Sequence, residues 1–397
     1  MKTILIKNGR VIDPANHLDG VRDILVENGA IARVETDIKT QAEVTIDAKD
    51  RIILPGLVDM HVHLREPGRE DKETVSSGTK AALRGGVTTA LAMPNTNPAM
   101  DSADAILLFK KIIAATAQAN VLACGTITQN RAGLALADFV ALKGAGAIAV
   151  SDDGGSVEDS ALMAEAFKRA KAAGLLVICH SEDKALAGHG VMNLGYMSTV
   201  LGLRGIPAAS EYTRIQRDID LAAAAGCPVH IAHVSCKESV ALIAAAKKKG
   251  VRVTAETAPH YVAFTDEALA DYDTHFKMNP PLRGAEDVAA IKQGLKDGTI
   301  DAIASDHAPH TENEKDVEFD RAEFGVTGLE TELSAAVTFL VDTGFLTWSD
   351  LVRRMSLSTA RIMGLDKGTL SPGRAADLLV LDPAASWTLT KKSFASK

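Results

Sequence analysis

The chain has 397 residues, of which 46% are hydrophobic and 24% are charged, a balance typical of soluble globular enzymes. Its formal net charge of -8 argues against a nucleic acid or an anionic membrane as a partner. The four cysteines form no CxxC pair, the first residues lack a signal-peptide pattern, and no apolar run is long enough to span a bilayer. We therefore expect a cytoplasmic protein that binds neither nucleic acid nor membrane.

Residues 1–55 consist of short β-like runs separated by turn signals such as Asn8-Gly9 and Asn28-Gly29. This pattern predicts a small antiparallel β module. After residue 365 short β-like runs return, at 373–382 and at 387–390. Because the termini of a domain usually lie close together, we expect residues 366–397 to pair with residues 1–55 and to complete a small β-sandwich module.

Between these ends, over residues 56–365, short apolar runs alternate with helical patterns. The runs cover residues 57–63, 87–93, 120–127, 147–150, 175–180, 228–233, 251–256 and 301–305. The helical patterns cover 74–84, 103–119, 134–143, 160–173, 211–225, 237–249, 286–296 and 328–341. Eight β-then-α units in series predict the α/β class and a (β/α)8 barrel of the TIM type. The alternative is a doubly wound open sheet, but the chain has no glycine-rich nucleotide loop to support it.

The first apolar run ends in His61-Val62-His63-Leu64-Arg65. Because side chains alternate along a strand, His61 and His63 point to the same face. Two imidazoles at a strand end can bind a metal ion, whereas the alternative is that both only form hydrogen bonds within a packed core. More histidines and aspartates at later strand ends favour the metal site.

In a barrel enzyme the active site lies at the carboxyl ends of the strands. The histidines and aspartates at those ends are His61, His63, Asp152 or Asp153, His180, His233 and Asp306. Four imidazoles and two carboxylates without a thiolate suit one or two divalent ions, with zinc as the first choice.

Other histidines near the strand ends are not expected to bind metal. His230 lies three residues before His233 on one strand and faces the other way, so we interpret it as structural. His260 follows the seventh strand, but Ala258-Pro259 turns the chain first, so we leave it out of the site.

Several segments together carry a resemblance to a known family. They are Asp59-Met60-His61-Val62-His63-Leu64-Arg65-Glu66-Pro67-Gly68, Met93-Pro94-Asn95-Thr96, Ser151-Asp152-Asp153-Gly154, His180-Ser181-Glu182, His230-Ile231-Ala232-His233-Val234-Ser235, Asn279-Pro280-Pro281-Leu282-Arg283 and Ser305-Asp306-His307-Ala308-Pro309-His310. The set resembles the dihydroorotase family, bacterial type I class, within the amidohydrolase superfamily. The resemblance covers nearly the whole chain, although relatives typically continue somewhat beyond the position of Lys397.

This resemblance implies the reversible, metal-dependent cyclisation of N-carbamoyl-L-aspartate to L-dihydroorotate and water, the third step of de novo pyrimidine (UMP) biosynthesis. Many superfamily members bridge two metals with a carbamylated lysine at the fourth strand end, but no lysine lies between Gly146 and Ser160. Asp153 is the closer match to the bridging aspartate of the type I class. We expect Asp152 to cap the helix near Ser160 or to hold the Gly154-Gly155 turn.

The implied cofactor is Zn²⁺, one or two ions per subunit, with two expected. The implied ligands are His61, His63, Asp153, His180, His233 and Asp306. Asp306 is also the expected catalytic residue, because a carboxylate beside the metal can take a proton from the attacking water and pass it to the leaving ring nitrogen.

Dihydroorotate carries a carboxylate that needs a cation and hydrogen-bond donors. Arg65 lies on the same face as His63 if the strand continues, and its guanidinium can grip a carboxylate with two hydrogen bonds. Asn95 and His310 follow the two neighbouring strands, so all three should converge. The alternative for Arg65 is a surface salt bridge with a nearby glutamate. The family resemblance adds His63, Asn279 and the backbone of Phe324 and Gly325 as substrate contacts.

Other functions stay open. A related cyclic amidase, such as allantoinase or hydantoinase, is disfavoured by the missing lysine and by the pair Arg65 and Asn95. An inactive subunit that only scaffolds aspartate transcarbamoylase should have lost its ligands, and a plain metal-binding protein needs no substrate arginine. The family suggests a homodimer, with aspartate transcarbamoylase as a further partner. The polar stretch 311–324 is either a lid or a solvated surface loop.

Overall fold

Eight parallel strands form the central sheet in a computed structural model that describes residues 2–397. In the order of their pairing they are β6 (Leu57–Val62), β7 (Val87–Ala92), β8 (Asn120–Gly125), β9 (Ala147–Val150), β10 (Leu176–Cys179), β13 (Val229–Ile231), β14 (Val253–Thr257) and β15 (Ala302–Ile303). The sheet closes just beyond β15, where Val62 bridges His307 and the amide of His63 donates to the carbonyl of His307 at 2.8 Å. The predicted (β/α)8 barrel is therefore confirmed.

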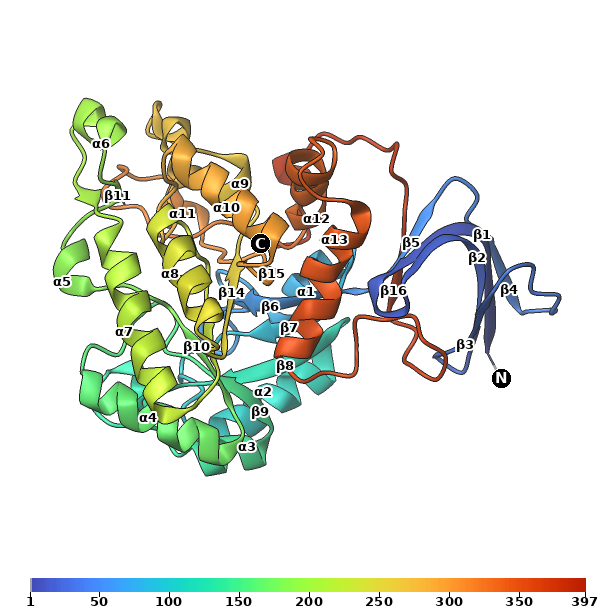
Figure 1. Cartoon of the computed structure of the whole chain (residues 1–397), viewed down its shortest axis with the longest axis horizontal. Coiled ribbons are helices and arrows are strands. Elements are labelled where there is room, and N and C mark those ends of the chain that lie inside the picture. Colours follow the sequence, from blue (N-terminus) through green and yellow to red (C-terminus); the bar gives the residue numbers. More distant parts are fainter. Residues whose placement is uncertain (1) are drawn as a thin grey trace.

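The main helices lie outside the strands (Figure 1). They are α1 (Val75–Arg84), α2 (Ala103–Thr116), α3 (Phe139–Ala145), α4 (Ser160–Ala173), α7 (Ala209–Ala225), α8 (Lys237–Lys248), α10 (Ala285–Asp297) and α12 (Glu332–Ala336). The sequence marks the ends of α4 clearly, since Asp159 accepts hydrogen bonds from its first amides and Gly174 ends it with a φ of +66°. α3 begins later than predicted, because Leu136 pairs with Thr128 in an isolated β-bridge instead of joining the helix.

Apolar side chains fill the inside of the barrel. Val58 and Met60 from β6, Leu91 from β7 and Ile178 from β10 form one buried cluster. Ala360 in α14 (Ser358–Ile362) packs against the same cluster, so this helix belongs to the same core. The strands are buried on both faces, as their continuous apolar runs predict.

A second sheet joins the two ends of the chain (Figure 1). Its strands are β1 (Thr3–Asp13), β2 (Leu18–Glu27), β3 (Ala30–Glu35), β4 (Val44–Asp47), β5 (Ile52–Pro55) and β16 (Leu378–Leu381). β16 pairs antiparallel with β5, so the predicted meeting of the terminal segments is confirmed. β4 and β5 run parallel to β1, so the prediction of an antiparallel module is wrong for these pairs. The domain boundaries at residues 55 and 365 stay a prediction.

The run 387–390 does not form the predicted strand. Trp387 and Leu389 are 53% and 41% exposed, and no strand of the described chain follows β16. A strand needs one face buried against a partner, and these side chains have none. Within residues 2–397 no helix is both long and apolar enough to cross a membrane.

Asp13 connects the β module to the C-terminal segment. It is 1% exposed and accepts hydrogen bonds from the amide of Leu370 at 2.7 Å and the hydroxyl of Thr369 at 3.0 Å. We predict that Asp13→Ala lowers the free energy of unfolding by roughly 2–4 kcal/mol, because it leaves a buried amide without an acceptor. Denaturant unfolding measures this.

The matched control is Asp19→Ala, which removes an exposed ion pair with Arg10 and should cost about 1 kcal/mol or less. Equal effects of the two substitutions would contradict the role of Asp13.

Candidate active site

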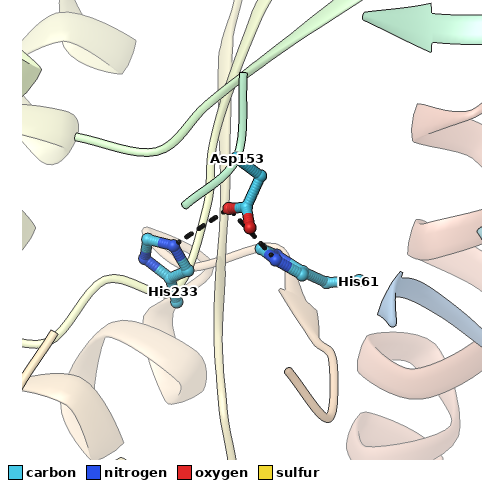
Figure 2. Close-up of side chains that lie close together, drawn as sticks. All are labelled: His61, Asp153 and His233. Atoms are coloured by element: carbon cyan, nitrogen blue, oxygen red, sulfur yellow. Dashed lines mark ion pairs between the residues drawn. The ribbon is translucent and has the colours of Figure 1, made fainter. Parts of the chain in front are cut away.

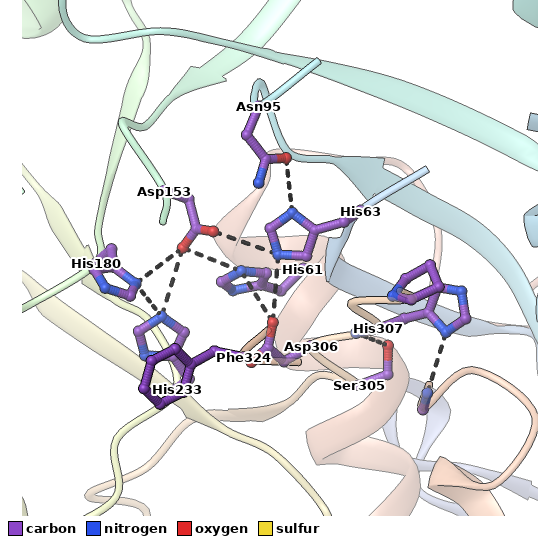
Figure 3. Close-up of polar contacts among 12 residues, drawn as sticks. His61, His63, Asn95, Asp153, His180, His233, Ser305, Asp306, His307 and Phe324 are labelled. Carbon is purple, nitrogen blue, oxygen red and sulfur yellow. Dashed lines mark hydrogen bonds and ion pairs between the residues drawn. The ribbon is translucent and has the colours of Figure 1, made fainter. Parts of the chain in front are cut away.

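Asp153 lies among four buried histidines at the carboxyl ends of the barrel strands (Figures 2 and 3). Its Oδ1 is 3.3 Å from His61 Nε2, 3.4 Å from His180 Nδ1 and 3.5 Å from His233 Nε2. Its Oδ2 is 3.4 Å from His63 Nε2. These side chains come from the ends of β6, β9, β10 and β13, so the barrel brings together the residues that the strand-end argument selected.

Asp306 lies on the other side of the His61–His63 pair (Figure 3). Its Oδ1 is 3.4 Å from His63 Nε2 and 3.6 Å from His61 Nε2. Its backbone has a φ of +47°, an uncommon conformation for a residue with a side chain. This places the carboxylate against the imidazoles directly after β15.

These side chains form two candidate metal-binding clusters. One cluster holds His61, His63 and Asp306, and the other holds His61, Asp153 and His233. The first contains the predicted pair His61 and His63, whereas the second includes His61 and leaves out His180. His180 Nδ1 and His233 Nε2 are 2.8 Å apart, so His180 lies directly beside this second cluster.

The donor atoms fit a cation. His61 Nε2 and Asp153 Oδ1 are fully buried and have no hydrogen-bond partner within residues 2–397, which is costly unless a cation satisfies them. Burial alone would raise the pKa of Asp153, but the charge of His61 and contacts from His180 and His233 hold it well below its usual value. Asp153 is therefore an anion, and nitrogen and oxygen donors of this kind suit zinc.

Two further residues contact the ring nitrogens of His61 and His63 that point away from Asp153. Glu256, at the end of β14, places Oε1 2.7 Å from His61 Nδ1 and Oε2 3.3 Å from His230 Nε2. Asn95 places its Oδ1 2.8 Å from His63 Nδ1. Such partners fix the ring orientation and tautomer of metal-binding histidines. Sequence reasoning missed Glu256, because its only signal was a single carboxylate at the end of a strand. His230, which was interpreted as structural, contacts Glu256 and helps to hold it in place.

Asp152 has a structural role with partners that differ from those expected. Its Oδ1 accepts hydrogen bonds from the amides of Ile127 at 2.8 Å and Thr128 at 3.0 Å. It therefore holds the loop after β8, and the cap of α4 is Asp159 instead. The prediction that Asp152 caps α4 or holds the glycine turn is wrong, because the neighbouring loop lies closer than the helix.

Arg65 reaches the site by a different route from the expected one. β6 ends at Val62, and Arg65 has a φ of +61°, so the strand does not continue to it. The guanidinium nevertheless lies inside, with Nε donating to the carbonyl of Pro309 at 3.2 Å and Nη2 3.4 Å from His310 Nε2. No ion pair joins Arg65 to a carboxylate in the described chain; Glu66 and Glu70 bind backbone amides instead. The surface salt bridge is thereby excluded.

His310 is held between Lys72 and the backbone of Phe324. Lys72 Nζ lies 3.0 Å from His310 Nδ1, and His310 Nε2 lies 2.8 Å from the carbonyl of Phe324. A protonated lysine can only donate, so we assign the proton of the ring to Nε2. Burial and the charges of Arg65 and Lys72 lower the pKa of His310 to about 3, so the ring is neutral. Lys72 was missed because only the folded chain brings it to His310.

Asn279 and Gly325 occupy the remaining predicted positions. Asn279 Nδ2 donates to Glu182 Oε1 at 3.0 Å, which orients its amide beside the His180 loop. The amide of Gly325 donates to the carbonyl of Lys277 at 3.0 Å, and its own carbonyl accepts from Lys315 Nζ at 2.9 Å. Both polar groups of Gly325 are therefore already used within the protein.

His260 lies closer to the site than the sequence suggested. It is buried with Nε2 unpartnered in the described chain. Burial, together with the charges of His233 and His61, lowers its pKa to about 4 against the opposing charge of Asp306. The turn at Ala258-Pro259 therefore does not direct the His260 ring away from the site, as the sequence had suggested.

Similarity to known proteins indicates the family of the chain. Residues 50–239 match a family model described as dihydro-orotase-like. The curated dihydroorotase of Elusimicrobium minutum is 54% identical over 392 residues, which cover 99% of this chain and 91% of the relative. The dihydroorotase of Geobacter metallireducens is 51% identical over 395 residues, which cover 99% and 93%.

The fold is also similar to that of solved structures. An L-hydantoinase (dihydropyrimidinase) from Arthrobacter aurescens superposes with a TM-score of 0.85 at 28% identity, over 96% of this chain and 86% of that one. Sequence identity is far higher to the dihydroorotases than to this hydantoinase, and the similarity to them runs from end to end. The chain belongs to the dihydroorotase family.

Proposed function

We propose that the protein catalyses the reversible cyclisation of N-carbamoyl-L-aspartate to L-dihydroorotate and water, and that it uses two Zn²⁺ ions to do so. The observation that carries this proposal is one buried carboxylate, Asp153, within 3.3–3.5 Å of four imidazole nitrogens. A lone aspartate so placed can bridge two cations. Beside it lies the Arg65–His310 pair, which suits a substrate carboxylate.

The proposed ligands of one ion are His61, His63 and Asp306, and those of the other are His180 and His233, with Asp153 between the two. Zinc bound here would polarise the ring amide carbonyl and make water acidic enough to act as a nucleophile at neutral pH. Glu256 and Asn95 keep the rings of His61 and His63 in position for this.

Asp306 is the proposed proton carrier. Its Oδ1 faces His61 and His63, which leaves Oδ2 to accept a proton from the attacking water. In the hydrolytic direction Asp306 passes this proton to the leaving ring nitrogen, and in the biosynthetic direction the steps reverse. Burial would raise the pKa of Asp306, but the charge of His61 and the contact with His63 hold it well below its usual value, so it starts as an anion.

The substrate carboxylate would lie between Arg65, His310 and Asn95. The neutral His310, held in this position, can share its Nε2–H between the carbonyl of Phe324 and the carboxylate. The amide oxygen of Asn95 is engaged by His63, and its nitrogen can donate. Because Asn279 binds Glu182 through its amide nitrogen, its amide oxygen can accept a hydrogen bond from a ring N–H of the substrate. A homodimer, an association with aspartate transcarbamoylase and a cytoplasmic location all stay predictions.

The first test of this function is an assay with dihydroorotate, allantoin and dihydrouracil, before and after chelation. We expect hydrolysis of dihydroorotate alone, its loss with a chelator, and its return on adding zinc. Equal hydrolysis of dihydrouracil would point to a hydantoinase, and the absence of any turnover in a zinc-loaded protein would favour a scaffold.

A second prediction concerns Asp306. Asp306→Asn should retain some metal but lose the proton carrier, which typically contributes about 10²–10⁴-fold to the rate. Turnover and metal content of the same sample measure both effects. Asp316→Asn, at an exposed site, is the control. Near-normal turnover of Asp306→Asn would place the proton transfer elsewhere.

A third prediction concerns substrate choice. Arg65→Lys keeps the charge but loses the planar fork, so kcat/KM for dihydroorotate should fall roughly tenfold or more, equivalent to the loss of one charge-assisted hydrogen bond. Metal content should not change. The control is Arg169→Lys, on the exposed face of α4. An unchanged kcat/KM for Arg65→Lys would remove Arg65 from the carboxylate pocket.

A further inference from the structure

Two buried lysines pin the segment 311–326 to the barrel. Lys315, at the end of the short helix α11 (Glu312–Lys315), is 7% exposed, and Lys277 is 2% exposed. Phe319 and Ala322 in the same segment are also buried. The segment is therefore anchored to the barrel by these side chains, although most of its charged residues are exposed.

Lys315 donates only to backbone carbonyls. Its Nζ lies 3.2 Å from the carbonyl of Lys277, 2.9 Å from that of Glu323 and 2.9 Å from that of Gly325. An ammonium group has three hydrogens, and here three carbonyls surround it. Lys315 thus joins its own segment to the stretch from Lys277 to Asn279.

Lys277 makes the reciprocal connection. Its Nζ lies 2.7 Å from the carbonyl of Phe319 and 3.3 Å from that of Asp320. It also lies 4.6 Å from the centre of the Phe324 ring and 5.4 Å from that of Phe319, within the range of cation–π attraction. The two lysines therefore hold the segment at both of its ends and in its middle.

Neither ammonium forms an ion pair with a carboxylate in the described chain, so these contacts are not the usual salt bridges. Burial lowers the pKa of each lysine to about 8. Both are still mainly protonated at pH 7, so the hydrogens needed for these contacts are present. Burying two such cations is unfavourable unless the carbonyls around them are fixed.

One of the carbonyls that Lys315 binds, that of Gly325, belongs to the predicted substrate pocket. Gly325 sits where an added Cβ would lie 2.6 Å from the carbonyl oxygen of Ala308 and 3.0 Å from His310 Nε2. The neighbouring Phe324 carbonyl contacts the same nitrogen at 2.8 Å. A displacement of the Phe324–Gly325 backbone would therefore move the partner of His310.

We propose that Lys277 and Lys315 are positioning residues that hold segment 311–326 as a fixed wall of the substrate pocket, so that His310 and the Phe324–Gly325 backbone are in place before dihydroorotate binds. The proposal rests on the proposed function for its substrate. The expected consequence is a binding site that needs no lid closure on this side.

Substitution of the lysines separates positioning from general stability. Lys315→Met and Lys277→Met keep the length of the side chain and remove the ammonium. We expect KM for dihydroorotate to rise roughly tenfold or more, because several charge-assisted hydrogen bonds are lost, while kcat at saturation and metal content stay within about twofold. The control is Lys391→Met, because Lys391 pairs with Glu312 on the exposed side of the same segment. An unchanged KM in both buried-lysine variants would overturn the proposal.

Hydrogen exchange of the unmodified protein tests the wall directly, even if the variants fail to fold. The hydrogen-bonded amides of the segment, those of Asp316, Arg321, Ala322, Glu323 and Gly325, should exchange slowly without substrate, and dihydroorotate should change their rates less than twofold. Fast exchange that slows only with substrate would show a lid and overturn the proposal. This measurement needs no turnover. If the protein is inactive but the segment exchanges slowly, the proposed function is wrong, whereas the proposal that the segment is a fixed wall still holds.

Discussion

The contact between the Asp153 carboxylate and four imidazoles governs the rest of the site. An anion and four rings packed at 3.3–3.5 Å with little access to water need positive charge between them. Divalent ions bound between them would supply this charge. The proposed chemistry follows from this demand, because the same ions that satisfy Asp153 would activate water and the substrate carbonyl.

The barrel makes this cluster by joining distant parts of the chain at one rim. Arg65 and His310 are 245 residues apart, yet they meet where the sheet closes between β6 and the segment after β15. His307 stands at that closure. Its Nδ1 accepts from the amide of Gly328 at 3.1 Å and its Nε2 contacts Glu73 at 3.2 Å. The contacts that close the barrel therefore also fix the residue next to Asp306.

Strand-end residues were predictable because two simple rules act on them. Alternation pairs His61 with His63, and the common rim of a parallel barrel brings His180, His233 and Asp306 to the same place. Residue patterns also located the β segments of residues 1–55 and the last strand, β16, but not the absence of a strand at 387–390. They did not give strand direction, since a half-buried strand looks the same whether its neighbour is parallel or antiparallel. For that reason β4 and β5 were assigned the wrong orientation.

The residues that were missed act through tertiary contacts alone. Glu256 and Lys72 look like ordinary charged residues in the sequence, and their partners, His61 and His310, are far away along the chain. Lys277 and Lys315 bind backbone carbonyls, which no side-chain pattern encodes. Asp152 was predicted to have a structural role, but its partners lie in a neighbouring loop instead of its own helix. The spacing of residues along the chain thus predicts candidate metal ligands better than it predicts the residues that hold those ligands in position.

The position of the ions tests the central role of Asp153 most directly. Anomalous diffraction at the zinc edge from crystals of the zinc-loaded protein would locate each ion and its ligands. We predict two ions, one bound by His61, His63 and Asp306 and the other by His180 and His233, with one oxygen of Asp153 on each or one shared between them. Two well-occupied ions with Asp153 turned away from both would contradict the account.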